Sequence, residues 1–261
     1  MEIPYYHIDA FTGTLFAGNP AGVCLLTSWP DDTLLQAIAG ENRLSETAFL
    51  VGSGSEYELR WFTPTTEVDL CGHATLAASF VLYRQPGVDP GPLLFHSRSG
   101  DLRVSRDNEM LFLDFPSRKA EEISCPDLLV KGLGAQPVAT YAKRDLMAVF
   151  DSEEEIRELN PDFSLLARLD SMGCIVTAPG NEVDFVSRFF APSVGINEDP
   201  VTGSAHCTLI PYWSKRLNKK ELLARQVSAR GGELLCLDEG KRVTIGGRAT
   251  LYMTGTLHIP E

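Results

Sequence analysis

Hydrophobic and polar positions follow the same order in the two halves of this 261-residue chain. In the first half, an apolar strand at 21–26 leads through a capped amphipathic helix at 31–41 to a second apolar strand at 47–51. The second half repeats this order with a strand at 145–150, a helical stretch from Ser152 to about Asp170 and a strand at 173–179. The pattern predicts two units built alike.

A short motif marks the same repeat. The segments "YELRWFTP" (57–64) and "FVSRFFAP" (185–192) share an aromatic residue, Arg, an aromatic residue, Phe and Pro in one order. A period of about half the chain indicates two similar domains rather than a solenoid. Pro and charged residues replace strand alternation near 116, so we expect domains at 1–116 and 117–261. The last strands could complete either sheet.

A helix is expected after each of these motifs. One begins at Gly72 in "CGHATLAASFVLY" and the other at Gly203 in "TGSAHCTLIPYWSKRL". Residues 74–83 carry no charge, which predicts a helix that is buried on all sides. A curved, mostly antiparallel or mixed sheet around this central helix would bury it. The expected fold class is therefore α+β, with two pseudo-repeat domains.

The two helix starts are candidate anion sites. A helix N-terminus presents unpaired N–H groups and a partial positive charge, and glycine lets a ligand approach closely. If the units pack face to face about a pseudo-twofold axis, the starts at Gly72 and Gly203 can point into one cleft. The predicted ligand is a small anionic organic acid.

Proton chemistry is expected where the halves differ. Glu46 stands at the entry to the second strand, and the matching position of the other half has no acid. A carboxyl beside a low-dielectric cleft could have a raised pKa and both take and return a proton. The alternative is a solvated strand end. His73 could adjust that pKa or simply fill space, and Asp199 and Ser204 could assist or only stabilise loops and caps.

The six cysteines lie far apart, and the pairs Cys71 with His73 and His206 with Cys207 lack zinc spacing. We therefore expect no metal site. A thiol at a helix start has a lowered pKa, so Cys71 suggests an epimerase as an alternative. The matching loop lacks a second thiol, because Cys207 lies a full turn inside its helix.

Composition restricts the partners. A net charge of −12 and a pI near 4.9 oppose binding to nucleic acid. No apolar run approaches the roughly 20 residues that cross a bilayer, and the N-terminus lacks the pattern of a signal peptide. We expect a cytoplasmic protein without membrane contact.

Five segments resemble the PhzF family of phenazine-biosynthesis proteins, within the diaminopimelate epimerase-like fold. They are "DAFTGTLFAGNPAGVCLL", "LSETAFL", "RWFTPTTEVDLCGHATLA", "RFFAPSVGINEDPVTGSAH" and "RGGEL". The resemblance covers essentially the whole chain. It implies two similar domains with the active site between them, and a homodimer.

The resemblance also implies roles for single residues. Glu46 corresponds to the acid/base that shuttles the proton, and His73, Asp199 and Ser204 to residues that assist it and position the substrate. The substrate-binding residues implied in the same way are Asn19, Gly72 and Gly203. The family activity is isomerisation of a dihydro-hydroxyanthranilate without metal or organic cofactor. Two other functions stay open: a thiol-dependent amino-acid epimerase or racemase using Cys71, and a non-catalytic interaction protein.

Overall fold

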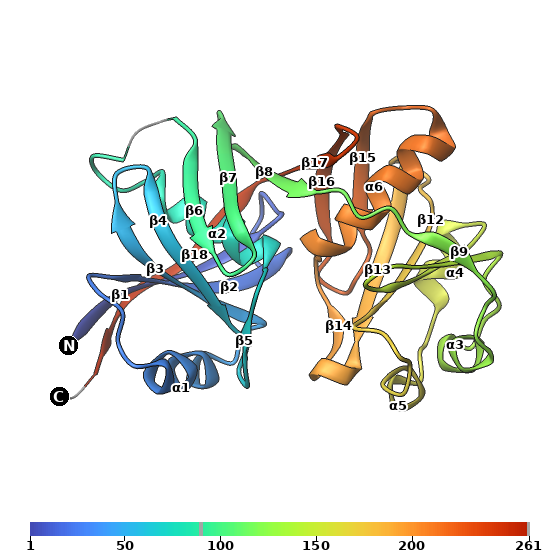
Figure 1. Cartoon of the computed structure of the whole chain (residues 1–261), viewed down its shortest axis with the longest axis horizontal. Coiled ribbons are helices and arrows are strands. Elements are labelled where there is room, and N and C mark those ends of the chain that lie inside the picture. The colour runs from blue at the N-terminus through green and yellow to red at the C-terminus, as the bar shows by residue number, and fades with distance from the viewer. Residues whose placement is uncertain (89–90, 260–261) are drawn as a thin grey trace. The chain divides into compact units, whose positions relative to one another are not determined.

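The computed structural model describes residues 1–88 and 91–259. The chain divides into two compact units, which we call unit 1 (Met1–Phe115 with Ile245–Glu261) and unit 2 (Pro116–Thr244). Figure 1 shows the elements of each unit. The last strand, β18 (Ala249–His258), pairs antiparallel with β1 (Glu2–Ala10) and so lies in unit 1.

The described residues of unit 1 form mainly strands, together with two helices. Its further strands are β2 (Asn19–Leu26), β3 (Glu46–Ser53), β4 (Glu56–Phe62), β5 (Glu67–Val68), β6 (Leu93–Ser97), β7 (Gly100–Asp107) and β8 (Met110–Pro116). Its helices are α1 (Asp32–Asn42) and α2 (Gly72–Leu82).

Unit 2 is also built mainly of strands. Its strands are β9 (Glu121–Ile123), β10 (Ala139–Ala142), β11 (Leu146–Val149), β12 (Cys174–Pro179), β13 (Phe185–Ala191), β14 (Ile196–Asp199), β15 (Glu221–Gln226) and β16 (Gly232–Asp238). Strand β17 (Arg242–Gly247) is divided between the units, because the boundary falls between Thr244 and Ile245. Its helices are α3 (Asp127–Leu133), α4 (Glu153–Glu158), α5 (Phe163–Leu166) and α6 (Gly203–Leu217), with a 3₁₀ turn at Pro192–Val194.

Strand pairing repeats between the units. In unit 1, β2 and β3 are parallel, β3 and β4 antiparallel, and β4 and β6 parallel. In unit 2, the pairs β11 with β12, β12 with β13, and β13 with β15 have the same directions in the same order. Each unit therefore has a mixed sheet, and the expected α+β fold with a structural repeat is confirmed.

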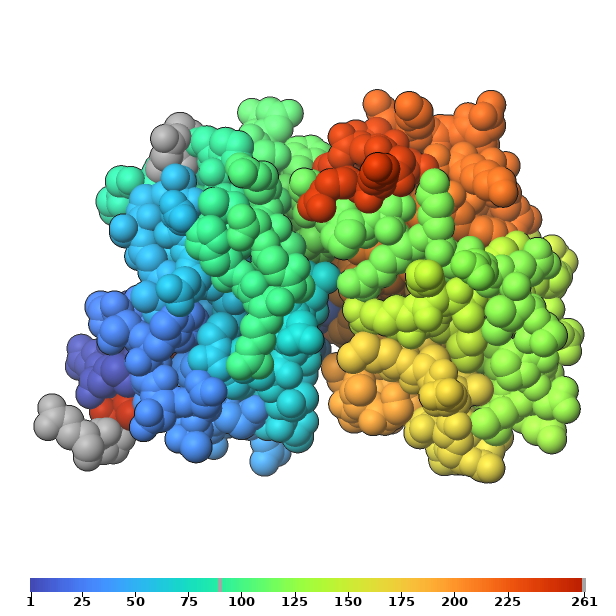
Figure 2. Space-filling view, viewed as in Figure 1, coloured from blue at the N-terminus to red at the C-terminus, as the bar shows by residue number. Residues whose placement is uncertain are grey.

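Each unit also has a buried central helix. All 11 residues of α2 are buried, and the helix packs against β1, β2, β3 and β18. In unit 2, the Trp213 ring of α6 stacks on Phe185 with centroids 5.5 Å apart, and its indole N–H donates to Thr177 Oγ1 at 2.9 Å. In Figure 2, β7 (green) forms part of the surface of unit 1. Of the helices within residues 1–88 and 91–259, none is long and apolar enough to span a membrane.

The continuous helical stretch expected from Ser152 to about Asp170 is wrong. The structure has two short helices there, α4 and α5, separated by an irregular segment. Pro161 lies in that segment. Proline lacks the amide donor that a helix interior requires and disfavours helical geometry in the residue before it, so it ends the first helix.

The repeated motif has a structural role in both units. The Arg60 guanidinium donates through two nitrogens to the Glu67 carboxylate, at 2.7 and 2.8 Å. Arg188 donates in the same way to Glu198, at 2.7 and 2.9 Å. Such two-point pairing with a carboxylate suits arginine and not lysine. The motif therefore recurs because each unit ties two neighbouring strands together with the same ion pair.

Candidate active site

Three elements of unit 1 bring the site residues together. Glu46 is the first residue of β3, which pairs in parallel with β2 so that Glu46 lies opposite Ala21. Asn19 begins β2, and α2 packs against both strands. Because α2 begins at Gly72, its first turn places His73 near the start of both strands.

His73 contacts the predicted proton carrier directly. Its Nε2 lies 3.2 Å from Glu46 Oε2, and the two side chains are only 4% and 12% exposed. Burial lowers the pKa of His73 to about 3. The imidazole is therefore neutral at neutral pH, because removing it from water penalises the charged form. Glu46 thus has a polar neighbour in the interior without a formal positive charge.

Asn19 determines which ring nitrogen of His73 carries the proton. The Asn19 amide nitrogen lies 3.1 Å from His73 Nδ1, and the asparagine is fully buried. An amide NH₂ only donates, so Nδ1 accepts and the proton of the neutral ring resides on Nε2, the atom that faces Glu46. The assignment of Asn19 as a substrate-binding residue stays a prediction.

Cys71 lies on the other side of the same ring. It is the N-cap residue of α2, and its Sγ is 3.5 Å from His73 Nδ1. Glu46, Cys71 and His73 each offer one metal-ligand atom, and these atoms lie within 4.8 Å of one another. Zinc ligands must all approach one point at about 2.0–2.3 Å. Here the thiol is close to Nδ1 and the carboxylate to Nε2, so this geometry does not fit one ion without rearrangement.

At the start of α6, hydrogen bonds hold Asp199 and its loop. Thr202 Oγ1 donates to Asp199 Oδ2 at 2.5 Å, and the Thr202 amide donates to Gln226 Oε1 at 2.9 Å. The Gln226 amide donates to the backbone carbonyl of Asp199 at 2.7 Å. Gln226 is buried on the last position of β15. It therefore fixes the loop that leads into the helix.

Gly203 and Ser204 are buried at the first turn of α6. Behind them, His206 Nδ1 donates to the carbonyl of Thr202 at 2.9 Å. Burial lowers the pKa of His206 to about 4, so this imidazole is also neutral at neutral pH. Its position favours a structural role in shaping the helix start.

Neither helix start is capped by its own N-cap side chain. The first N–H groups of a helix have no partner within it. In the fully described first turns of α2 and α6 there is no acidic residue, and neither N-cap side chain, Cys71 or Thr202, makes a capping hydrogen bond. Such a start suits an anion from outside the helix.

The structure brings Glu46 and His73 together in unit 1, and Asp199, Gly203 and Ser204 together in unit 2. The shared cleft expected for all of them stays a prediction. The sequence analysis missed Gln226. Its signal was a polar residue at an inward-facing position of an alternating strand, where an apolar residue is usual.

Comparison with known proteins places this geometry in context. Residues 8–255 match the family model PhzC-PhzF, described as phenazine biosynthesis-like protein. An uncharacterized isomerase of Pseudomonas aeruginosa is 52% identical over 99% of this chain and 100% of its own. The crystal structure of a PhzF-family phenazine biosynthesis protein from Enterococcus faecalis is 50% identical, with a TM-score of 0.96 over 99% of this chain and 100% of that chain. The crystal structure of a hydroxyproline epimerase from Agrobacterium vitis shares the fold alone. It is 10% identical, with a TM-score of 0.62 over 98% of this chain and 92% of that chain.

Proposed function

The chain belongs to the PhzC-PhzF family of phenazine biosynthesis-like proteins, and we propose that it is an isomerase that moves a proton on a small carboxylate-bearing substrate without metal or organic cofactor. It is an enzyme of the isomerase class, as its relatives are. Glu46 serves first as the base and then as the acid. The observation that carries this role is the contact of its carboxylate with the buried, neutral His73.

The proposed reaction moves one proton between two carbon atoms. The Glu46 carboxylate takes a proton from a substrate carbon, and the electron pair of the broken C–H bond delocalises into the neighbouring unsaturated system. The protonated Glu46 then returns the proton to a second carbon, so atoms and charge balance. His73 Nε2–H faces the carboxylate and keeps it oriented, since Asn19 fixes the ring from the other side. Acid/base catalysis of this kind contributes roughly 10² to 10⁴ in rate.

The helix starts are proposed to hold the carboxylate of the substrate. The uncapped N–H groups at Gly72–His73 and Gly203–Ser204 support this role, with Asp199 and Ser204 positioning the rest of the molecule.

Exchange of carbon-bound hydrogen with deuterated water tests the proposal. Cyclic and linear amino acids and dihydroaromatic acids are incubated with the enzyme, and NMR follows loss of the proton signal. We expect at least one of these acids to exchange with the natural enzyme and with Glu41→Gln, a matched change at an exposed glutamate, but not with Glu46→Gln. Exchange that survives in Glu46→Gln would remove this residue from the mechanism.

We also propose a homodimer. Three side chains of unit 1 leave apolar surface in solvent: Phe16 is 70%, Tyr252 50% and Met253 44% exposed. The Phe16 and Tyr252 rings contact each other with centroids 5.9 Å apart, so these two side chains form one patch, which a second copy would cover. Sedimentation at micromolar concentration should give twice the chain mass, and Tyr252→Glu should give the monomer. The cytoplasmic location stays a prediction.

A further inference from the structure

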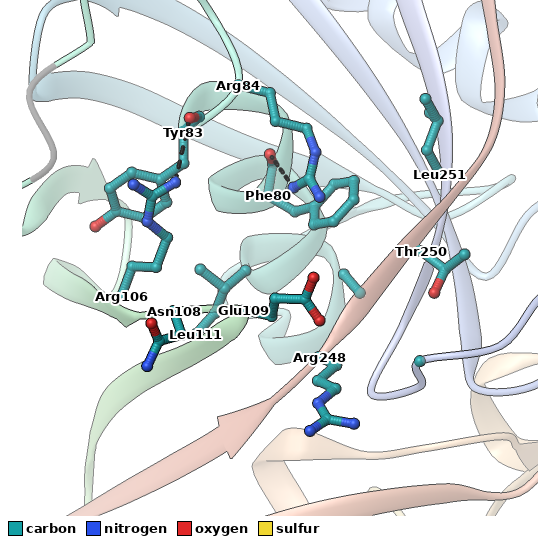
Figure 3. A pocket seen from close by; sticks show the side chains of 12 residues that line it. Phe80, Tyr83, Arg84, Arg106, Asn108, Glu109, Leu111, Arg248, Thr250 and Leu251 are labelled. Atoms are coloured by element: carbon teal, nitrogen blue, oxygen red, sulfur yellow. Dashed lines mark hydrogen bonds between the residues drawn. The ribbon is translucent and has the colours of Figure 1, made fainter.

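Three arginines line a hollow in unit 1. This hollow lies at the end of α2 that is far from Glu46 and His73. It has a volume of about 530 Å³, and Arg84, Arg106 and Arg248 line it together with Glu109. Figure 3 shows these side chains around the opening. They come from three separate segments: the turn after α2, strand β7 and the residue before β18. α2 is 11 residues long, so its two ends are roughly 16 Å apart, and the hollow is distinct from the candidate active site.

Two of the guanidinium groups are held in place by aromatic rings. The Arg84 Cζ lies 3.5 Å from the centroid of the Phe80 ring, and the Arg106 Cζ lies 4.7 Å from that of Tyr83. Each group also donates through Nη1 to the carbonyl of the same aromatic residue, at 3.4 Å, as the dashed lines in Figure 3 mark. Stacking and hydrogen bonding restrict both side chains before any ligand arrives, which lowers the entropic cost of binding.

Glu109 offsets only part of the positive charge of this hollow. Within residues 1–88 and 91–259, none of the three guanidinium groups forms an ion pair. Burial lowers the pKa of Arg84, Glu109 raises it and the charge of Arg106 lowers it further, so two like charges act on each other here. The whole chain has 35 acidic and 23 basic residues, yet this hollow has three arginines to one glutamate.

A purely structural role explains only part of this arrangement. An arginine beyond a helix C-terminus offsets the helix dipole, and arginine stems often cover aromatic surface. These roles fit Arg84 and Arg106. In the described part of the chain, however, the Arg248 side chain makes neither an aromatic contact nor an ion pair, although it lines the same hollow and passes Gly13. An anionic ligand gives all three arginines one partner.

We propose that this hollow binds a small organic or inorganic molecule carrying at least two negative charges, either as phosphate or as carboxylate groups. Guanidinium groups recognise both oxyanions through paired N–H donors. The volume lies within the range of small-molecule sites.

Calorimetry with pyrophosphate and with citrate, in 150 mM NaCl, tests the proposal. We expect at least one of them to bind with a Kd below about 1 mM. Tighter binding of pyrophosphate would identify a phosphorylated ligand, and tighter binding of citrate a polycarboxylate. Arg106→Gln and Arg248→Gln should each weaken binding by about tenfold, because each removes a charged hydrogen-bonding partner. Glu109→Gln should tighten it, since the carboxylate repels the ligand.

A matched variant controls for unspecific electrostatic attraction of the anions to basic side chains elsewhere on the protein. Lys215 lines a second basic hollow in unit 2, of about 950 Å³, and Lys215→Gln removes one charge there. This variant should bind as the natural protein does. Thermal unfolding of each variant checks folding, which these exposed positions should leave intact. Absence of binding by both anions, or an equal loss in Lys215→Gln and Arg106→Gln, would overturn the proposal.

Discussion

The two units repeat one scaffold, but the starts of their central helices differ in chemistry. In unit 1, a partly buried acid, a neutral histidine and a thiol meet at the start of α2. In unit 2, the corresponding start of α6 is a closed network of neutral donors and acceptors around Asp199, with Thr202 and Gln226. The comparison teaches that a duplicated fold can keep its ion pairs and its sheet while the polar groups at the starts of its two central helices differ.

Packing shows why the second unit has no counterpart of Glu46. By strand pairing, Gly173 occupies the matching position just before β12. A Cβ atom at Gly173 would lie 2.3 Å from Cζ of Phe189, so the aromatic ring fills the space that a side chain would need. An acid cannot be added there without moving that ring.

The largest expected effect is a difference in exchange rate between variants of the two carboxylic acids, Glu46 and Asp199. Glu46→Gln should lower the rate of substrate exchange by about 10³, because it removes the proposed proton carrier. Asp199→Asn should lower it by only about tenfold or less, because an amide oxygen can still accept the hydrogen bond from Thr202. The measurement is the exchange rate in deuterated water. Equal losses in the two variants would show that both units supply chemistry.

The next effect concerns pH and should be common to both units. The pKa values of His73 and His206, about 3 and about 4, lie below the value near 6.5 expected in the unfolded chain. Their neutral burial therefore stabilises the fold fully above about pH 6.5, and this contribution is lost as pH falls towards the folded values. Between pH 7 and pH 5, each of the two histidines should lower the free energy of unfolding by about 2 kcal/mol, because it takes up a proton in the unfolded chain but not in the folded protein.

Denaturant unfolding at both pH values checks this. His73→Gln and His206→Gln should each reduce the loss between pH 7 and pH 5. His96→Gln is the control with the opposite sign, because the hydrogen bonds that exposed His96 donates to Glu56 and to Asp101 raise its pKa. Its contribution is present at low pH and is lost as pH rises. An unchanged slope in His73→Gln would mean that folding does not lower the pKa of this ring.

A smaller effect tests the ion pairs that the units share. Arg60→Gln and Arg188→Gln should each destabilise the protein by about 1 to 2 kcal/mol. We expect the larger loss for Arg188, because its third nitrogen also donates to the carbonyls of Ile156 and Leu159, whereas that of Arg60 meets the largely exposed Asp32. Removing Arg188 therefore leaves backbone acceptors without this donor.

Thermal or denaturant unfolding measures both losses. Arg103→Gln, an exposed arginine on β7, is the matched control and should change stability by less than about 0.5 kcal/mol. A loss confined to one unit would show that the repeated motif is not used alike in the two copies.

Much of the fold could be predicted from the sequence because its signals are local. The uncharged run at 74–83 and the glycines at 72 and 203 gave the central helices and their starts. Glu46 was singled out because its half had an acid that the other lacked. The break between α4 and α5 was missed although Pro161 signals it.

The contacts within the site could not be predicted, because they join residues far apart in the chain. Asn19 and His73 are separated by 54 positions, and Asp199 and Gln226 by 27. No periodicity relates such pairs, and only the folded sheets bring them together. The neutral state of His73 likewise depends on burial by several elements, which a motif does not reveal.

The smallest expected effect decides between a carboxylate and a thiol as the reacting group of unit 1. Cys71 and Thr202 occupy the same N-cap position in the two units, and both lie beside a helix start without capping it. If Glu46 carries the proton, Cys71→Ser keeps a small polar side chain near His73 and should change the exchange rate by no more than about threefold, since surrounding contacts are retained. If the thiol is a base, the rate should fall about as far as in Glu46→Gln, because a serine hydroxyl is far less acidic than a thiol. Measuring Cys71→Ser and Cys207→Ser side by side gives the control, since Cys207 is fully buried inside α6, where its thiol contacts the carbonyl of Gly203.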